Sequence, residues 1–115
     1  MNKPNPIVIT NTETNKTYTL EFNRVSVKLA ERNGLDIAKV ASEPMSVISK
    51  LFHWAFYMHH PKQLNQDQTD EILFEQLGGM SGEMLDRLCE LYAYTLETLY
   101  QDEDRAKNSM WAVTL

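Results

Sequence analysis

The chain has 115 residues, of which 43% are hydrophobic and 23% are charged, and these ordinary globular values exclude a wholly disordered protein. Its 11 basic and 16 acidic residues give a formal net charge of −5, so no positive excess attracts phosphates and we expect no nucleic-acid partner. The N-terminus lacks the apolar core of a signal peptide, and no run approaches the roughly 18 apolar residues of a membrane span. We therefore expect a cytoplasmic protein with no membrane partner.

Two short strands are predicted first, forming a hairpin over about residues 6–22. Both runs are rich in β-branched and aromatic residues, and in the second run Tyr18 and Leu20 alternate with Thr19 and Glu21. The connection NTETNK contains no glycine, so it predicts a wider loop than a two-residue turn. Because a lone hairpin is marginally stable in water, it needs a covering layer.

Helical patterns supply that layer. Asn23 as a cap and Gly34 as a stop predict a helix over about 24–33. Pro44 suits a first helical turn, and the apolar segment that follows predicts a helix over about 44–59, ending before Pro61.

Two further helices are predicted. The first covers about 69–77, with Asp70 and Glu71 in its first turn and Gly78-Gly79 as its exit. Ser81 opens the second and longest, over about 82–101. The expected fold is α+β, mainly α-helical: one compact domain over residues 1–101, with an N-terminal β-hairpin packed on a bundle of about four helices. Residues 102–115 are expected to form a mobile C-terminal tail.

Three histidines in FHWAFYMHHP raise the question of a metal or catalytic site. His53 and His60 are separated by about 10.5 Å of helical rise, too far for one zinc ion, and His59 and His60 point about 100 degrees apart. We expect no metal site here, and we expect His59 and His60 to cap the C-terminus of their helix.

No other group of residues predicts chemistry. The acidic residues near Asp70 and in the stretch 102–104 are expected in solvated positions, where nothing would separate their pKa values. Cys89 has no basic neighbour on its helix face and is expected to pack in the core. We therefore predict a protein that is not an enzyme, with no catalytic residue and no cofactor.

Five segments carry a resemblance: YTLEFNR, AERNGLD, LFHWAFYMHHPK, TDEILFEQLGG and MLDRLCELYAYTLETLY. Their order over about residues 17–101 resembles the small tail assembly chaperones of long-tailed phages and prophages of Gram-positive bacteria. The most specific pieces are residues 21–24, 34–36, 56–61 and 69–71. Residues 1–6 and 110–115 have no place in the pattern of that family.

The resemblance implies a non-enzymatic protein of the cytoplasm of an infected or lysogenic bacterium. It would bind the tape measure protein and keep it soluble during assembly of the tail tube, and it would be absent from the finished virion. The tail tube protein and self-association are further expected contacts. A longer form made by translational frameshifting is also typical of the family.

A surface for the partner follows as a hypothesis. A groove lined by Leu51, Trp54, Met58 and by Tyr92 or Tyr94 would cover the apolar stripe of a tape measure helix. Core packing is the competing interpretation of the same residues. The alternative function is a minor structural subunit of the tail or of the head-tail connector.

Overall fold

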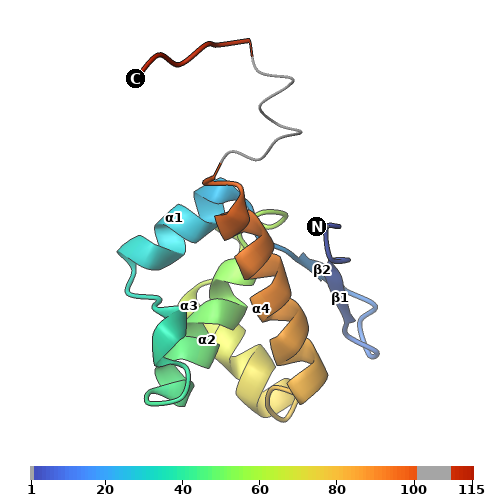
Figure 1. Cartoon of the computed structure of the whole chain (residues 1–115). Coiled ribbons are helices and arrows are strands. Elements are labelled where there is room, and N and C mark those ends of the chain that lie inside the picture. The colour runs from blue at the N-terminus through green and yellow to red at the C-terminus, as the bar shows by residue number, and fades with distance from the viewer. Residues whose placement is uncertain (1, 101–109) are drawn as a thin grey trace.

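The computed structural model describes residues 2–100 and 110–115. In chain order it contains β1 (Ile7–Thr10), β2 (Thr17–Leu20), α1 (Arg24–Arg32), a short 3-10 turn η1 (Ile37–Lys39), α2 (Pro44–Ala55), α3 (Gln66–Asp70), a π-helix η2 (Glu71–Gln76) and α4 (Gly82–Glu97). The hairpin lies beside the helices, so the predicted class, α+β and mainly helical, is confirmed (Figure 1). None of the helices in these ranges combines the length and apolarity required to cross a membrane.

The hairpin is antiparallel, with Ile7 opposite Leu20 and Thr10 opposite Thr17. Its loop spans residues 11–16, as expected from the lack of glycine, and the Asn11 side chain accepts hydrogen bonds from two backbone N–H groups within that loop. Side chains become more buried along β2, from the exposed Thr17 to the buried Leu20, and the following two residues are buried as well. The chain therefore enters the buried interior of the protein immediately after β2.

Four local signals mark helix ends where they were predicted. Asn23 caps α1 in a capping box with Ser26, and Ser81 caps α4. Pro44 occupies the first turn of α2. Gly34 follows α1 with φ of +91°, a conformation that glycine adopts at little cost.

Three helix boundaries differ from the prediction. The helix expected to reach residue 59 ends at Ala55, and turns follow it. The next helix starts at Gln66 and not at about 69, because Asn65 and Gln68 form a capping box before the predicted start. Asp70 therefore closes α3, and the π-helix η2 continues the helical segment from Glu71 to Gln76. The last helix ends at Glu97, with the end predicted at 101 lying outside the described residues.

The core is centred on α2, which contacts α1, α3 and α4 (Figure 1). Leu51, Phe52 and Ala55 are completely buried there. The hairpin contributes Leu20, and α4 contributes Leu88 and Leu91. Edge-to-face aromatic contacts link Phe52 to Phe56 and Phe56 to Tyr18, so the core continues from α2 to the hairpin.

The two ends of the chain differ in their contacts. At the N-terminus, Lys3 pairs with Glu21, and Arg87 donates a hydrogen bond to the Asn5 carbonyl at 3.1 Å, so this segment is attached to β2 and α4. Of the predicted mobile tail, residues 102–109 lie outside the described residues. Residues 110–115 are exposed and belong to no helix or strand.

Candidate functional site

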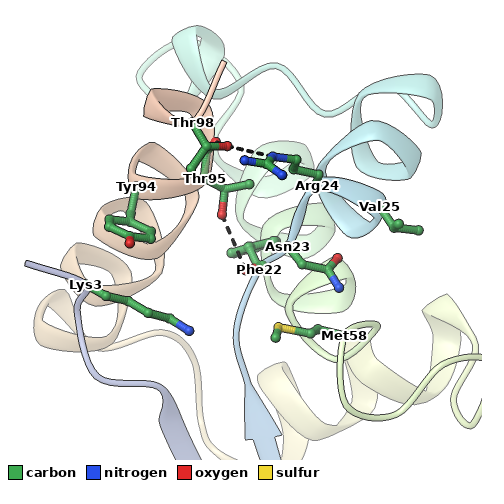
Figure 2. A pocket seen from close by; sticks show the side chains of 9 residues that line it. All are labelled: Lys3, Phe22, Asn23, Arg24, Val25, Met58, Tyr94, Thr95 and Thr98. Carbon is green, nitrogen blue, oxygen red and sulfur yellow. Dashed lines mark hydrogen bonds between the residues drawn. The ribbon is translucent and has the colours of Figure 1, made fainter. Parts of the chain in front are cut away.

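The connection from β2 to α1, residues 21–23, and the first residue of α1, Arg24, form hydrogen bonds with the ends of α2 and α4. The Glu21 N–H donates to the Ala55 carbonyl at 2.9 Å, at the end of α2. The Thr95 hydroxyl donates to the Phe22 carbonyl at 3.3 Å, and Arg24 Nε donates to the Thr98 hydroxyl at 3.0 Å (Figure 2). These bonds fix the start of α1 against the end of α4.

The Glu21 carboxylate lies at the base of this connection and is only 3% exposed. One of its oxygens lies 2.8 Å from His59 Nε2, and the other pairs with the ammonium group of Lys3. Burial acts to raise the pKa of Glu21, but the contacts with Lys3 and His59 outweigh it and hold the pKa below its ordinary value. The carboxylate is thus ionised and paired with two groups distant in sequence.

An open groove lies above this connection, with a cavity volume of about 370 Å³. Tyr94 on α4 and Met58 in the turn after α2 lie on opposite sides of the strand that leads into Phe22 (Figure 2). The complete lining is Lys3, Phe22, Asn23, Arg24, Val25, Met58, Tyr94, Thr95 and Thr98. We call this cavity the α1–α4 groove; it combines apolar walls with two basic residues.

The five residues predicted to bind a partner lie in different environments in the structure. Met58 and Tyr94 both line the α1–α4 groove. Trp54 is half-buried and stacks near Tyr57, with ring centroids 5.8 Å apart, but it does not line the groove. Leu51 and Tyr92 are 0% and 4% exposed and belong to the core. The hypothesis of a surface groove is therefore retained for Met58 and Tyr94, and Leu51 and Tyr92 are assigned to packing.

The three histidines serve three separate contacts. His60 Nε2 accepts a hydrogen bond from the Thr19 N–H at 3.0 Å, and His59 contacts Glu21, so both attach the turn after α2 to the hairpin. His53 Nδ1 lies 2.8 Å from the Thr69 hydroxyl, which joins α2 to α3. The expected helix-capping role of His59 and His60 is therefore wrong. Within residues 2–100 and 110–115, no three His, Cys, Asp or Glu side chains are grouped to hold a metal ion.

The other residues considered for chemistry occupy structural positions. Asp70 accepts hydrogen bonds from Ser49 at 2.5 Å and from Gln66 at 3.1 Å, so it joins α2 to α3. Cys89 is half-buried beside the core, and burial raises the pKa of its thiol. The acidic residues 102–104 lie outside the described part of the chain.

A second cavity, of about 830 Å³, lies between the hairpin loop and η2. Its lining includes Thr12, Lys16, Glu71 and Gln76, together with the partly buried Ile72. Most of these side chains are polar, and the α1–α4 groove is the cavity that contains residues predicted from the sequence.

The complete chain, residues 1–115, matches the family model described as a domain of unknown function, DUF5055. The chain belongs to the DUF5055 family. No curated protein and no solved structure matches it. This family description names no activity for the DUF5055 chain.

Sequence reasoning missed Lys3, Glu21 and Thr98 of the DUF5055 chain. In the sequence, Glu21 fits the alternating pattern of a strand, and no local signal links it to Lys3 or to His59, which lies 38 residues further along. The stretch EFNR is, however, one of the most specific pieces of the resemblance. That stretch is the connection that forms the base of the α1–α4 groove.

Proposed function

We propose that this protein is a phage tail assembly chaperone that binds the tape measure protein and keeps it soluble while the tail tube assembles. The observation that supports the proposal is the α1–α4 groove, which presents apolar side chains at an open surface. An amphipathic helix can lay its apolar face in such a groove. The proposed role is non-enzymatic, in the cytoplasm of an infected or lysogenic bacterium, with the protein absent from the finished virion.

Further exposed apolar side chains directly follow a residue of the groove lining in the sequence. Val25, at one side of the lining, is 55% exposed, and Leu99 and Tyr100, which directly follow the lining residue Thr98, are 73% and 75% exposed. Exposed apolar patches commonly mark protein-binding surfaces. This arrangement supports a binding site that continues along the end of α4.

The chemistry of the lining suits a partner presented in many helical registers. Methionine adapts its shape to different neighbours, and aromatic side chains supply a large apolar area, so Met58 and Tyr94 can cover different apolar stripes. The formal net charge of −5 would keep a complex with an apolar helix in solution.

Co-expression with the tape measure protein tests the proposal. The chain should co-elute in size-exclusion chromatography with tape measure protein that is insoluble when expressed alone. Replacing Met58 by Glu should abolish co-elution, because the variant places a charge against the apolar helix. The matched control is Met45→Glu, since Met45 is a 71% exposed methionine outside the groove lining.

A second groove variant guards against misfolding. Val25→Glu changes a residue that is already exposed, and circular dichroism should show that it retains the helices. Unchanged co-elution of folded Val25→Glu and Met58→Glu would exclude the groove as the binding site. Detection of the protein in purified virions by mass spectrometry would instead favour a minor structural subunit of the tail or connector.

A further inference from the structure

The buried Glu21 carboxylate has one oxygen whose neighbour is a lysine. Glu21 is only 3% exposed, and its Oε1 atom lies 2.8 Å from His59 Nε2. Its Oε2 atom pairs with the ammonium group of Lys3, and no other group in the described part of the chain donates a hydrogen bond to this oxygen. A buried carboxylate oxygen without a partner is costly, so a cation is favoured at this position.

Lys3 reaches this oxygen from a segment that belongs to no helix or strand. In residues 2–6, Pro4 and Pro6 have no N–H group with which to extend the hairpin. The Asn5 carbonyl accepts a hydrogen bond from Arg87, and the Lys3 side chain is 50% exposed. None of the residues 2–6 belongs to the hydrophobic core. The segment that carries the ammonium group can therefore move away without removing a core side chain.

The same position faces the α1–α4 groove. Lys3 is part of the groove lining, and Figure 2 shows its side chain running below Tyr94 toward the strand that leads into Phe22. The hydrogen bond with Glu21 raises the pKa of Lys3, so the contact favours the charged amine. Apolar walls can cover the carbon chain of an amine while its charged end pairs with a carboxylate.

We propose that Glu21 Oε2 is a binding site for a primary ammonium group, which Lys3 occupies in the free chain and a lysine of the partner takes over. A compact ammonium group suits one free oxygen, whereas arginine favours a carboxylate with both oxygens available, and Oε1 already contacts His59. The partner segment would combine an apolar face with a lysine. Transfer to the partner rests on the function proposed above, whereas the ammonium site does not.

Chemical rescue of the full chain tests the ammonium site. Lys3→Ala opens the site, and butylammonium chloride should raise its thermal unfolding midpoint with a saturable dependence on concentration, because a ligand of the folded state stabilises that state. Sodium chloride and 1-butanol at the same concentrations should give no saturable rise. The double variant Lys3→Ala/Glu21→Gln should not respond to the amine. The matched control is Lys28→Ala, which removes an exposed lysine outside the groove lining and should not respond either.

The rescue experiment separates this site from the proposed function. Circular dichroism should show that Lys3→Ala is folded, and Lys3→Ser, which opens the same space, should respond to the amine in the same way. No saturable rise in either folded variant would overturn the ammonium site and would leave the co-elution test of the groove unaffected. Rescue by the amine in a chain that fails to co-elute with the tape measure protein would support the site and exclude the proposed function.

Co-elution with the tape measure protein tests the transfer. Lys3→Ala should retain more of the partner than the unmodified chain does, because Lys3 then no longer competes for Glu21. Adding Glu21→Gln should remove this gain, and Lys28→Ala should retain as much as the unmodified chain. Equal retention by Lys3→Ala and the unmodified chain would overturn the transfer of the site to a partner lysine.

Discussion

His59 Nε2 lies 2.8 Å from Glu21 Oε1, and this contact attaches the turn after α2 to the residue that follows β2. The other carboxylate oxygen of Glu21 pairs with Lys3, so the N-terminal segment is attached at the same point. One buried carboxylate thus joins three segments that lie far apart in the sequence. The base of the α1–α4 groove depends on this junction.

Replacing Glu21 by Gln should lower the free energy of unfolding at pH 7 by about 1 to 3 kcal/mol, because bonds to a charged group are lost. The pKa of Glu21 is lowered in the folded protein, so its stabilising effect is present above the unfolded pKa, about 4.5, and disappears as the pH falls through the folded value. Urea unfolding between pH 3 and 7 should therefore show a weaker acid loss in Glu21→Gln. Glu13→Gln, in the exposed hairpin loop, is the control. Parallel pH curves for Glu21→Gln and the unmodified protein would contradict the prediction.

His53 should make the fold sensitive to mild acid. Burial lowers the pKa of His53 below 6.5, although the charge of Asp70 partly opposes this shift. Because the unfolded chain then binds a proton more readily than the folded protein, stability is present above pH 6.5 and falls as the pH decreases below it. His53→Gln should flatten the unfolding free energy between pH 7 and 5. An equally steep decline in the variant would assign the effect to other groups.

Replacing Leu51 by alanine should change the stability of the protein and not its binding of a partner. Its side chain is completely buried, so Leu51→Ala should lower the unfolding free energy by about 2 to 5 kcal/mol. Met45→Ala, at a 71% exposed position on the same helix, should change it by less than about 0.5 kcal/mol. Chemical denaturation measures both values. A small effect at Leu51 would show that this position is not part of a packed core.

Replacing Gly34 or Gly82 by alanine should change the stability of the protein in opposite directions. Gly34 has φ of +91°, so Gly34→Ala should destabilise the protein by about 1 kcal/mol through backbone strain. A Cβ atom there would also lie 2.9 Å from Lys50 Nζ, but this flexible side chain can move away. Gly82 begins α4 with no atom near its Cβ position, so Gly82→Ala should stabilise by about 0.5 kcal/mol. Thermal unfolding compares the two, and equal effects would refute the backbone argument.

Helix starts can be predicted from the sequence where a single residue caps or removes backbone N–H groups in the adjacent turn. Asn23, Pro44 and Ser81 satisfy or remove backbone N–H groups within a single turn, so the sequence contains the whole cause. The capping box of Asn65 and Gln68 acts by the same mechanism. The residues around it are polar and show no apolar period, so no helical pattern marks this helix start in the sequence.

The groove was only partly predictable, for a different reason. Helix α2 has apolar residues on more than one side, and the sequence does not show which side the other helices cover. The structure buries Leu51 and leaves Trp54 half-exposed, while Met58 lies beyond the end of the helix. The contacts that build the groove, from Thr95 to Phe22 and from Arg24 to Thr98, span more than 70 residues and follow from packing alone.

The π-helix η2 is a place in the bundle where the chain can lose one residue. The Leu77 N–H donates to the Ile72 carbonyl, a bond that encloses one residue more than an α-helical bond does. Deleting an exposed residue such as Glu75 would let α3 continue as a regular helix to Gly78 and Gly79. The same deletion within α4 would rotate every later side chain by about 100 degrees around the helix axis. Loss of one residue in η2 would therefore leave the direction of the Tyr94 side chain around the axis of α4 unchanged. Loss of one residue within α4, before Tyr94, would rotate that side chain.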